Sequence, residues 1–266
     1  MDFFSTFNPL FSVSGFFVGL LVGVTGVGGG SLMTPLLVLL FGVHPVTAVG
    51  TDLLYAAVTK GAGTFVHGRN RTIDWKVVAR LAAGSLPAAA LTLWFVSGID
   101  RHDIAAVATI TIALGYMLIL TAVLLIFRRR IIEKIRHLMR DRRPVQPSTV
   151  AILTVCLGLT LGVLVTLTSV GAGALGVTVL LALYPGLNVR NIVGSDIVHA
   201  VPLTLVAGLG YWSIGEVDWA MLATLLVGSI PGIMIGSHLS PRLPDRIVSA
   251  MLAVTLALVG TKLVFS

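Results

Sequence analysis

Charged residues are scarce in this chain. Only 11% of its 266 residues are Asp, Glu, Lys or Arg, whereas 56% are hydrophobic, and the mean hydropathy is +1.00. A soluble domain carries roughly 25% charged residues, so an ordinary soluble globular protein is excluded. Three uncharged runs are each long enough to cross a hydrocarbon core of ~30 Å as a helix: Leu81–Ile99, Ile104–Phe127 and Val150–Val170. We therefore expect an all-α, polytopic membrane protein.

Several chemical signatures are also missing. The single cysteine, Cys156, cannot form an internal disulfide. The first ten residues, MDFFSTFNPL, contain no basic residue, so a cleaved signal peptide is not expected. The glycine cluster at residues 26–30 fits neither a dinucleotide-binding fingerprint nor a P-loop. Neither a metal-ligand spacing nor a nucleophile–base pair is evident. We expect no cofactor, no bound metal and no enzymatic activity.

The few charges are concentrated in one segment. Residues 128–143, RRRIIEKIRHLMRDRR, carry eight Lys or Arg and two acids, a net charge of +6 out of +7 for the whole chain. Cytoplasmic loops of membrane proteins collect basic residues. This rule explains the segment without a nucleic-acid partner, and we expect none. We place the linker 128–147 in the cytoplasm and the protein in a bacterial plasma (inner) membrane, with the lipid bilayer as its surroundings.

The chain contains an internal repeat. Four short stretches recur in the same order at an offset of 143 or 144 residues: TGVGGG and TSVGAG, VGTD and VGSD, IDW and VDW, GSLPAA and GSIPGI. This predicts a first repeat at 1–127, the linker at 128–147 and a second repeat at 148–266. Internal repeats of this kind are common in secondary transporters.

The charges of matching loops predict that the two repeats are inverted. Counting crossings from the cytoplasmic linker places the loop 67–76, with Arg69, Arg71 and Lys76, inside; its counterpart, with Glu216 and Asp218, falls outside. Each repeat must then cross the membrane an odd number of times. The run 10–41 around the glycines forms either two short crossings or a re-entrant hairpin, and the sequence leaves both open.

The glycine clusters predict helix breaks that could bind an anion. Irregular backbone at membrane depth survives only inside protein or beside a wet cavity, and the first turn of a new helix offers free N–H groups to an anion. The alternative is close helix packing through small residues. The candidate substrate-binding residues are Thr25, Gly28, Gly29, Gly30, Ser31, Thr34, Thr168, Ser169, Gly171 and Gly173.

Four ionisable residues fall inside predicted spans and are candidates for coupling or gating. Asp52 and Asp196 are equivalent in the repeat and either handle protons or sodium or cap helix starts. Lys60 could compensate substrate charge, snorkel toward the cytoplasmic face or pair with an acid. His199 lies one turn after Asp196 and is either a proton relay or a hydrogen-bonded structural residue.

The stretches GVTGVGGGSLMTPLL, AVGTDLLY, GTFVHGRNRTIDWK, VGSD and GEVDW resemble the TauE/SafE (sulfite exporter-like) family over nearly the full length. The resemblance implies a secondary transporter that exports sulfite, sulfoacetate or a related organosulfonate. The second glycine motif differs from the first copy at Ala172, which stands where the first copy has a glycine. The alternative is a proton- or sodium-coupled transporter of another small organic anion, with Asp52 and Asp196 as the cation site. A homodimer is left open.

Overall fold

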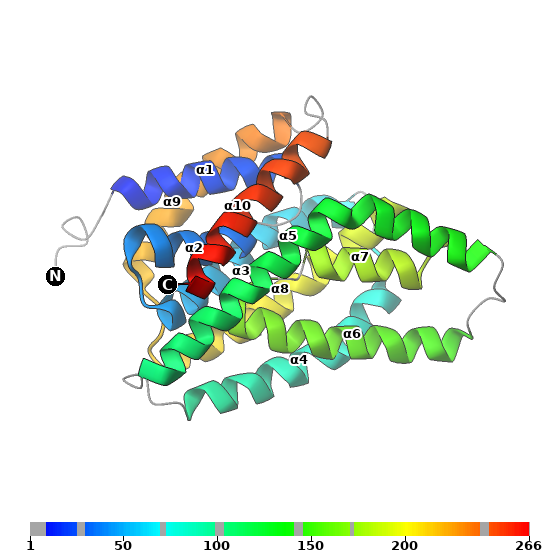
Figure 1. Cartoon of the computed structure of the whole chain (residues 1–266), viewed down its shortest axis with the longest axis horizontal. Helices are drawn as coiled ribbons and strands as arrows, with labels where there is room; N and C mark the ends of the chain where they lie inside the picture. Colours follow the sequence, from blue (N-terminus) through cyan, green and yellow to red (C-terminus); the bar gives the residue numbers. More distant parts are fainter. Residues whose placement is uncertain are drawn as a thin grey trace.

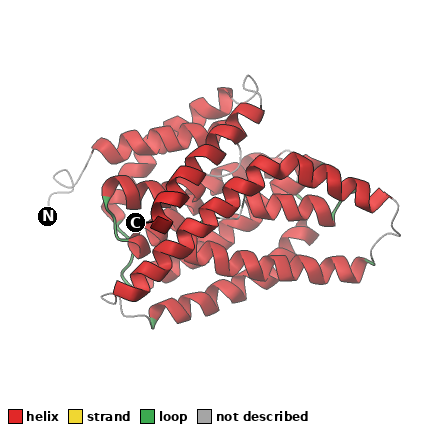
Figure 2. Ribbon diagram, in the orientation of Figure 1, coloured by secondary structure: helices red, strands yellow, loops and turns green. Residues whose placement is uncertain are grey.

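The computed structural model describes residues 9–25, 30–69, 73–98, 104–140, 146–170, 173–239 and 245–265. These residues form ten α-helices and, within the described ranges, no strand (Figure 1, Figure 2). The helices are α1 (Pro9–Thr25), α2 (Gly30–Phe41), α3 (Pro45–Arg69), α4 (Trp75–Ser97), α5 (Ile104–Arg140), α6 (Pro147–Thr168), α7 (Ala174–Leu183), α8 (Val189–Ser213), α9 (Trp219–Leu239) and α10 (Asp245–Phe265). The all-α prediction is confirmed.

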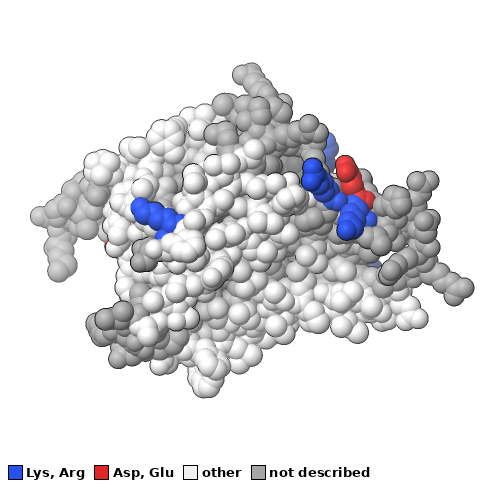
Figure 3. Space-filling view, viewed as in Figure 1, with Lys and Arg blue, Asp and Glu red and all other residues white. Residues whose placement is uncertain are grey.

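The distribution of side chains is that of a protein surrounded by lipid. Large apolar residues such as Leu91, Phe95 and Leu258 are exposed on the outside, whereas polar residues such as Thr51 and Asp52 are buried. On the face drawn in Figure 3, charged side chains gather in two small groups, with uncharged surface between them. Within the described residues, four helical segments are long and apolar enough to cross a membrane: Trp75–Ser97, Pro147–Thr168, Val189–Ser213 and Trp219–Gly236.

The halves of the chain pack against each other through matching pairs of helices. α1 lies along α9, and the corresponding helix of the second half, α6, lies along α4. α3 packs against its counterpart α8, and α5 against its counterpart α10 (Figure 1). Every one of these large contacts joins a helix of the first half to one of the second. Each half therefore buries its surface mainly against the other half.

Glycines allow two of these pairs to approach closely. Gly15 and Gly19 of α1 sit against the backbone of Leu225 and Ser229 on α9, where an added Cβ would collide. The corresponding glycines of α6, 158 and 162, sit in the same way against residues 81 and 85 of α4. The G-x-x-x-G motif thus serves packing inside one chain, as small residues often do between membrane helices.

The repeated VGTD/VGSD and IDW/VDW stretches hold the halves together by reciprocal hydrogen bonds. The backbone N–H of Asp74 donates to Ser195 Oγ at 2.8 Å, and the backbone N–H of Asp218 donates to Thr51 Oγ1 at 3.1 Å. The same aspartates begin α4 and α9: Asp74 Oδ1 accepts the N–H of Lys76, and Asp218 Oδ1 that of Met221. Each aspartate therefore caps a helix in its own half and contacts the other half.

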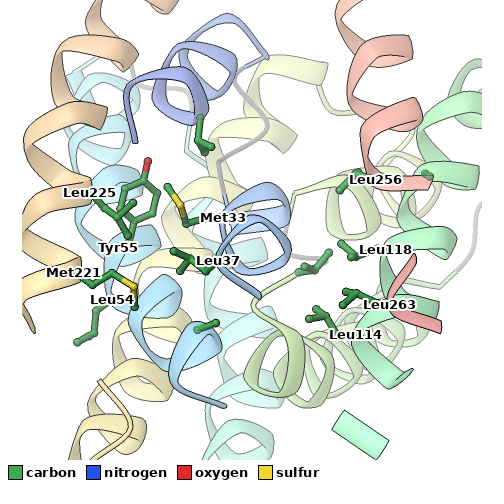
Figure 4. Packing of buried hydrophobic residues seen from close by; sticks show 14 of the residues in the cluster. Met33, Leu37, Leu54, Tyr55, Leu114, Leu118, Met221, Leu225, Leu256 and Leu263 are labelled. Atoms are coloured by element: carbon green, nitrogen blue, oxygen red, sulfur yellow. The ribbon is translucent and has the colours of Figure 1, made fainter. Parts of the chain in front are cut away.

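The core lies between these helices and is apolar. Figure 4 shows Met33, Leu37, Tyr55 and Leu225 packed together, and a second group formed by the leucines at 114, 118, 256 and 263. The short helix α2 is thus buried beside α3. Helix α5 continues without interruption into the basic segment, so the boundary expected at residue 127 falls inside a helix.

Candidate functional site

The second glycine cluster follows a helix break, as expected, whereas residues 26–29 of the first cluster lie outside the described residues. α1 ends at Thr25 and α2 begins at Gly30, while α6 ends at Thr168 and α7 begins at Ala174. Of the candidate residues, Gly28, Gly29 and Gly171 lie outside the described residues, and so do the side chains of Thr25 and Ser31. Two short helices follow the clusters. Helix α2 has 12 residues and begins at the last glycine of TGVGGG, and α7 has 10 residues and begins directly after TSVGAG.

The first turns of both short helices offer backbone donors. The first four N–H groups of a helix have no partner within it. α2 starts at Gly30, and α7 is preceded by Gly173, which has no side chain to cap it. On the other side of the second break, Ser169 adopts the left-handed conformation with a φ of 56° and ends α6.

Asp52 binds the beginning of α2 rather than of its own helix. Its Oδ2 accepts the backbone N–H of Thr34 at 3.1 Å and the Thr34 hydroxyl at 2.5 Å. Helix α3 starts at Pro45 and runs through Asp52, so Asp52 does not cap its own helix but binds a backbone N–H near the start of α2. The positive end of the α2 dipole favours this carboxylate. The Asp52 carboxylate thus lies near the start of α2, where an anionic substrate was expected to bind.

Asp196 takes the matching position in the second half. It is buried within α8, and its Oδ1 lies directly against Gly176 in the first turn of α7, where a Cβ would collide with it. Helix α8 begins at Val189 and runs through Asp196, so this aspartate does not cap its own helix either. In both halves, the aspartate of a long helix therefore approaches the start of the short helix before it.

Lys60 joins the two aspartates in one electrostatic cluster. It lies on α3, eight residues after Asp52, and only 7% of it is exposed. Its charge interacts with those of both Asp52 and Asp196. Lys60 therefore does not snorkel to the surface. With all three groups ionised, the cluster carries two negative charges and one positive charge.

His199 is a buried, hydrogen-bonded residue. Its Nε2 lies 2.7 Å from Ser85 Oγ on α4, and its Nδ1 has no hydrogen-bond partner among the described residues. His199 therefore does not form a hydrogen bond with Asp196, so the two do not act as a directly bonded proton relay. The structural interpretation of this histidine agrees with the geometry.

The counterpart of this pair in the other half is Tyr55 facing Ser229. Ser85 and Ser229 come from the repeated GSLPAA and GSIPGI stretches. The repeat marks both serines in the sequence, but nothing in the sequence indicates that they face a polar residue of the other half.

The hydroxyls at the second break have different surroundings. Thr168 Oγ1 donates to Leu164 O at 2.7 Å and accepts the N–H of Val170 at 3.2 Å, so it is used within its own turn. Ser169 is 4% exposed, and its hydroxyl faces the Asp52 carboxylate. The structure therefore brings together Ser169, Asp52, Thr34 and Lys60, but not Thr168.

Two further features do not contribute to this site. A groove of about 540 Å³ between α4 and α6 is lined by apolar side chains such as Leu91 and Leu159 and contains none of the candidate residues. Among the described residues, no group of three or more His, Cys, Asp or Glu side chains could hold a metal ion.

Known proteins resemble the chain along nearly its whole length. The family model described as "Sulfite exporter TauE/SafE" matches residues 11–263. The chain is 41% identical to "Probable membrane transporter protein YjnA" of Bacillus subtilis (strain 168), over 94% of this chain and 97% of that protein. It is 29% identical to "Probable membrane transporter protein YdhB" of the same organism, with the same coverage. A "Probable membrane transporter protein" of Xylella fastidiosa (strain Temecula1) is 26% identical over 86% of this chain and 84% of its own length.

No solved structure matches the chain. The family match covers both halves, including every described residue of the buried cluster. The chain is an integral membrane protein, and it belongs to the sulfite exporter TauE/SafE family of membrane transporters.

Proposed function

We propose that this transporter carries small sulfur-containing anions, such as sulfite, sulfoacetate or related organosulfonates, and exports them. The observation that carries the proposal is the match to a family described by sulfite export, over residues 11–263. The buried cluster supports it, because Lys60 supplies a positive charge deep in the protein. A charge at this depth costs ~2.5–3.5 kcal/mol even on the most lenient insertion scale, which favours a functional role.

The chemistry of the breaks suits a small oxyanion. The N–H groups of the first turns of α2 and α7 can each donate to sulfonate or sulfite oxygens. Lys60 provides the charge that these neutral donors lack. In this proposal, the substrate binds beside the cluster, with Lys60 as its principal cation and Thr34 and Ser169 at its edge.

Export needs no nucleotide. A negative-inside membrane potential drives an anion outward with about 2.3 kcal/mol per charge for each 100 mV. This energy is sufficient to move a monovalent anion against a gradient of roughly 40-fold at that potential. No motif for nucleotide hydrolysis is needed for this mechanism.

Flux measurements on purified protein in liposomes test the proposal. Vesicles loaded with sulfite or sulfoacetate should release the anion with saturable kinetics, and faster when a potassium diffusion potential makes the interior negative. Lys60→Met should lower the flux at least tenfold, because the substrate loses its countercharge. Lys262→Met removes an exposed lysine at the end of α10 and serves as the matched control. Absence of saturable flux for both anions would overturn the proposal.

The alternative substrate is another small organic anion moved together with protons or sodium, with Asp52 and Asp196 as the cation site. The electrostatic cluster supports this alternative, because the charges of two carboxylates interact with the charge of one lysine. Counterflow with a panel of carboxylates and sulfonates separates the alternatives. Competition by carboxylates alone would favour the second.

A further inference from the structure

One oxygen of the Asp52 carboxylate is left without a hydrogen bond. Oδ2 is bound by Thr34, but Oδ1 has no hydrogen-bond partner among the described residues, although the side chain is 0% exposed. The buried Ser169 hydroxyl faces this carboxylate and stabilises its ionised form as a nearby donor, and it has no other partner in the described part of the chain. Buried oxygens without partners cost ~1–3 kcal/mol each, and more when charged.

The last turn of α6, which ends beside Ser169, carries further oxygen atoms. Thr166 Oγ1, three residues before Ser169, is buried and has no partner within the described ranges. The carbonyls of a last helical turn have no intrahelical partner. Val165 O accepts the N–H of Ser169, and Thr166 O accepts the Tyr211 hydroxyl, at 2.7 and 3.0 Å. The helix dipole makes this end electronegative.

These observations place a carboxylate oxygen opposite the negative end of a helix and a second oxygen-bearing side chain. A cation between them would coordinate both the carboxylate oxygen and the hydroxyl oxygen, in addition to the stabilisation that Lys60 gives to the Asp52 charge. Half-helix C-termini with nearby carboxylates bind sodium ions in other transporters with broken helices.

We infer that a sodium ion binds between Asp52 Oδ1 and Ser169 Oγ at the C-terminal end of α6. All the donors are oxygens, which suit a hard cation. A single carboxylate matches a monovalent ion, since calcium sites usually gather six to eight oxygens, with several carboxylates among them. Lys60 also lies near and disfavours a second positive charge on the ion.

Only one of the two repeat-related positions offers both side chains. In the repeat, Gly26 is the counterpart of Ser169 and carries no hydroxyl. The equivalent site, which would combine Asp196 with residue 26, therefore lacks one of the two side-chain ligands. This inference concerns cation binding and does not depend on which anion is carried.

Thermal unfolding in detergent tests the site without any anion substrate. The unfolding temperature of the full chain is measured while sodium chloride replaces choline chloride at constant ionic strength. We expect a saturable rise of a few degrees with sodium, because a ligand that binds only the folded state stabilises it. Ser169→Ala should shift the half-saturating sodium concentration upward about tenfold, and Asp52→Asn should abolish the response.

Thr121→Val is the matched control for the loss of a buried hydroxyl. Thr121 is 1% exposed in α5, and its hydroxyl donates to Met117 O within its own helix. This variant should keep the sodium response of the parent. If Asp52→Asn does not fold, Ser169→Ala and binding of radioactive sodium to the parent chain decide the question.

Three results would overturn the inference: equal unfolding temperatures in sodium and choline, a full sodium response in Asp52→Asn, or no retention of radioactive sodium. Anion flux in liposomes is read separately. Failure of sodium binding with intact sulfite flux would leave the proposed function standing. Sodium binding without sulfite flux would reject the proposed substrate and leave the sodium site standing.

Discussion

Ser85 Oγ lies 2.7 Å from His199 Nε2 in the buried interior, and this contact joins α4 of the first half to α8 of the second. At the equivalent position of the repeat, Ser229 of α9 faces Tyr55 of α3. The halves therefore hold each other through polar contacts that water does not reach. In such surroundings, the loss of one partner leaves the other without any replacement.

Ser85→Ala should lower the free energy of unfolding by ~1–3 kcal/mol, because it leaves both nitrogens of His199 without a protein partner. The effect is measured as a change in chemical unfolding in detergent. Ser213→Ala is the control: Ser213 is exposed and its hydroxyl donates only to Gly210 O in its own helix. That variant should stay within ~0.5 kcal/mol of the parent. Equal stability of the two variants would contradict the role given to Ser85.

Thr34→Val should weaken the attachment of α2 to α3. The change keeps the shape of the side chain and the backbone N–H but removes the 2.5 Å hydrogen bond to Asp52. Hydrogen bonds to charged groups contribute ~1.5–3 kcal/mol, and we expect a loss of stability in that range together with reduced anion flux. Thr34→Ser retains the hydroxyl and should restore most of both. If the serine variant behaves like the valine variant, the methyl group and not the hydrogen bond is what matters.

Gly228→Ala should disrupt the contact between α9 and α1, since the new Cβ would collide with the backbone carbonyl of Ser12. Packing between these helices has little room to relax, so we expect low yield of folded protein or a clear loss of stability. Gly61→Ala is a matched substitution within a helix, with nothing near the added Cβ. It should be neutral or stabilise by up to ~1 kcal/mol, the gain in helix propensity. Size-exclusion profiles and unfolding temperatures in detergent check both variants.

The membrane class, the helix breaks and the buried aspartates could be predicted from the sequence because each leaves a local signal. Scarce charge, glycine clusters and acids inside apolar runs are visible without a structure. The partners of Asp52 could not be predicted, because Thr34 and Ser169 are 18 and 117 positions away along the chain. The repeat marked Thr51, Ser195, Asp74 and Asp218 as related, but only the fold pairs each hydroxyl with the other half.

Sodium should raise the affinity for the anion when its concentration is equal on both sides of the membrane. The ionised cluster carries a net charge of −1, and a bound sodium ion neutralises it, which removes repulsion from an incoming anion. We expect a fall of about tenfold in the half-saturating anion concentration when sodium replaces choline, equivalent to a coupling of ~1.4 kcal/mol. By linkage, the anion must raise the affinity for sodium by the same factor. Equal sodium on both sides removes its gradient as a driving force, so the measurement reads binding and not direction. Asp52→Asn removes the same negative charge permanently and should bind the anion equally well in sodium and in choline. A variant that still responds to sodium, or a parent that binds the anion equally well in both salts, would show that the two sites are not linked.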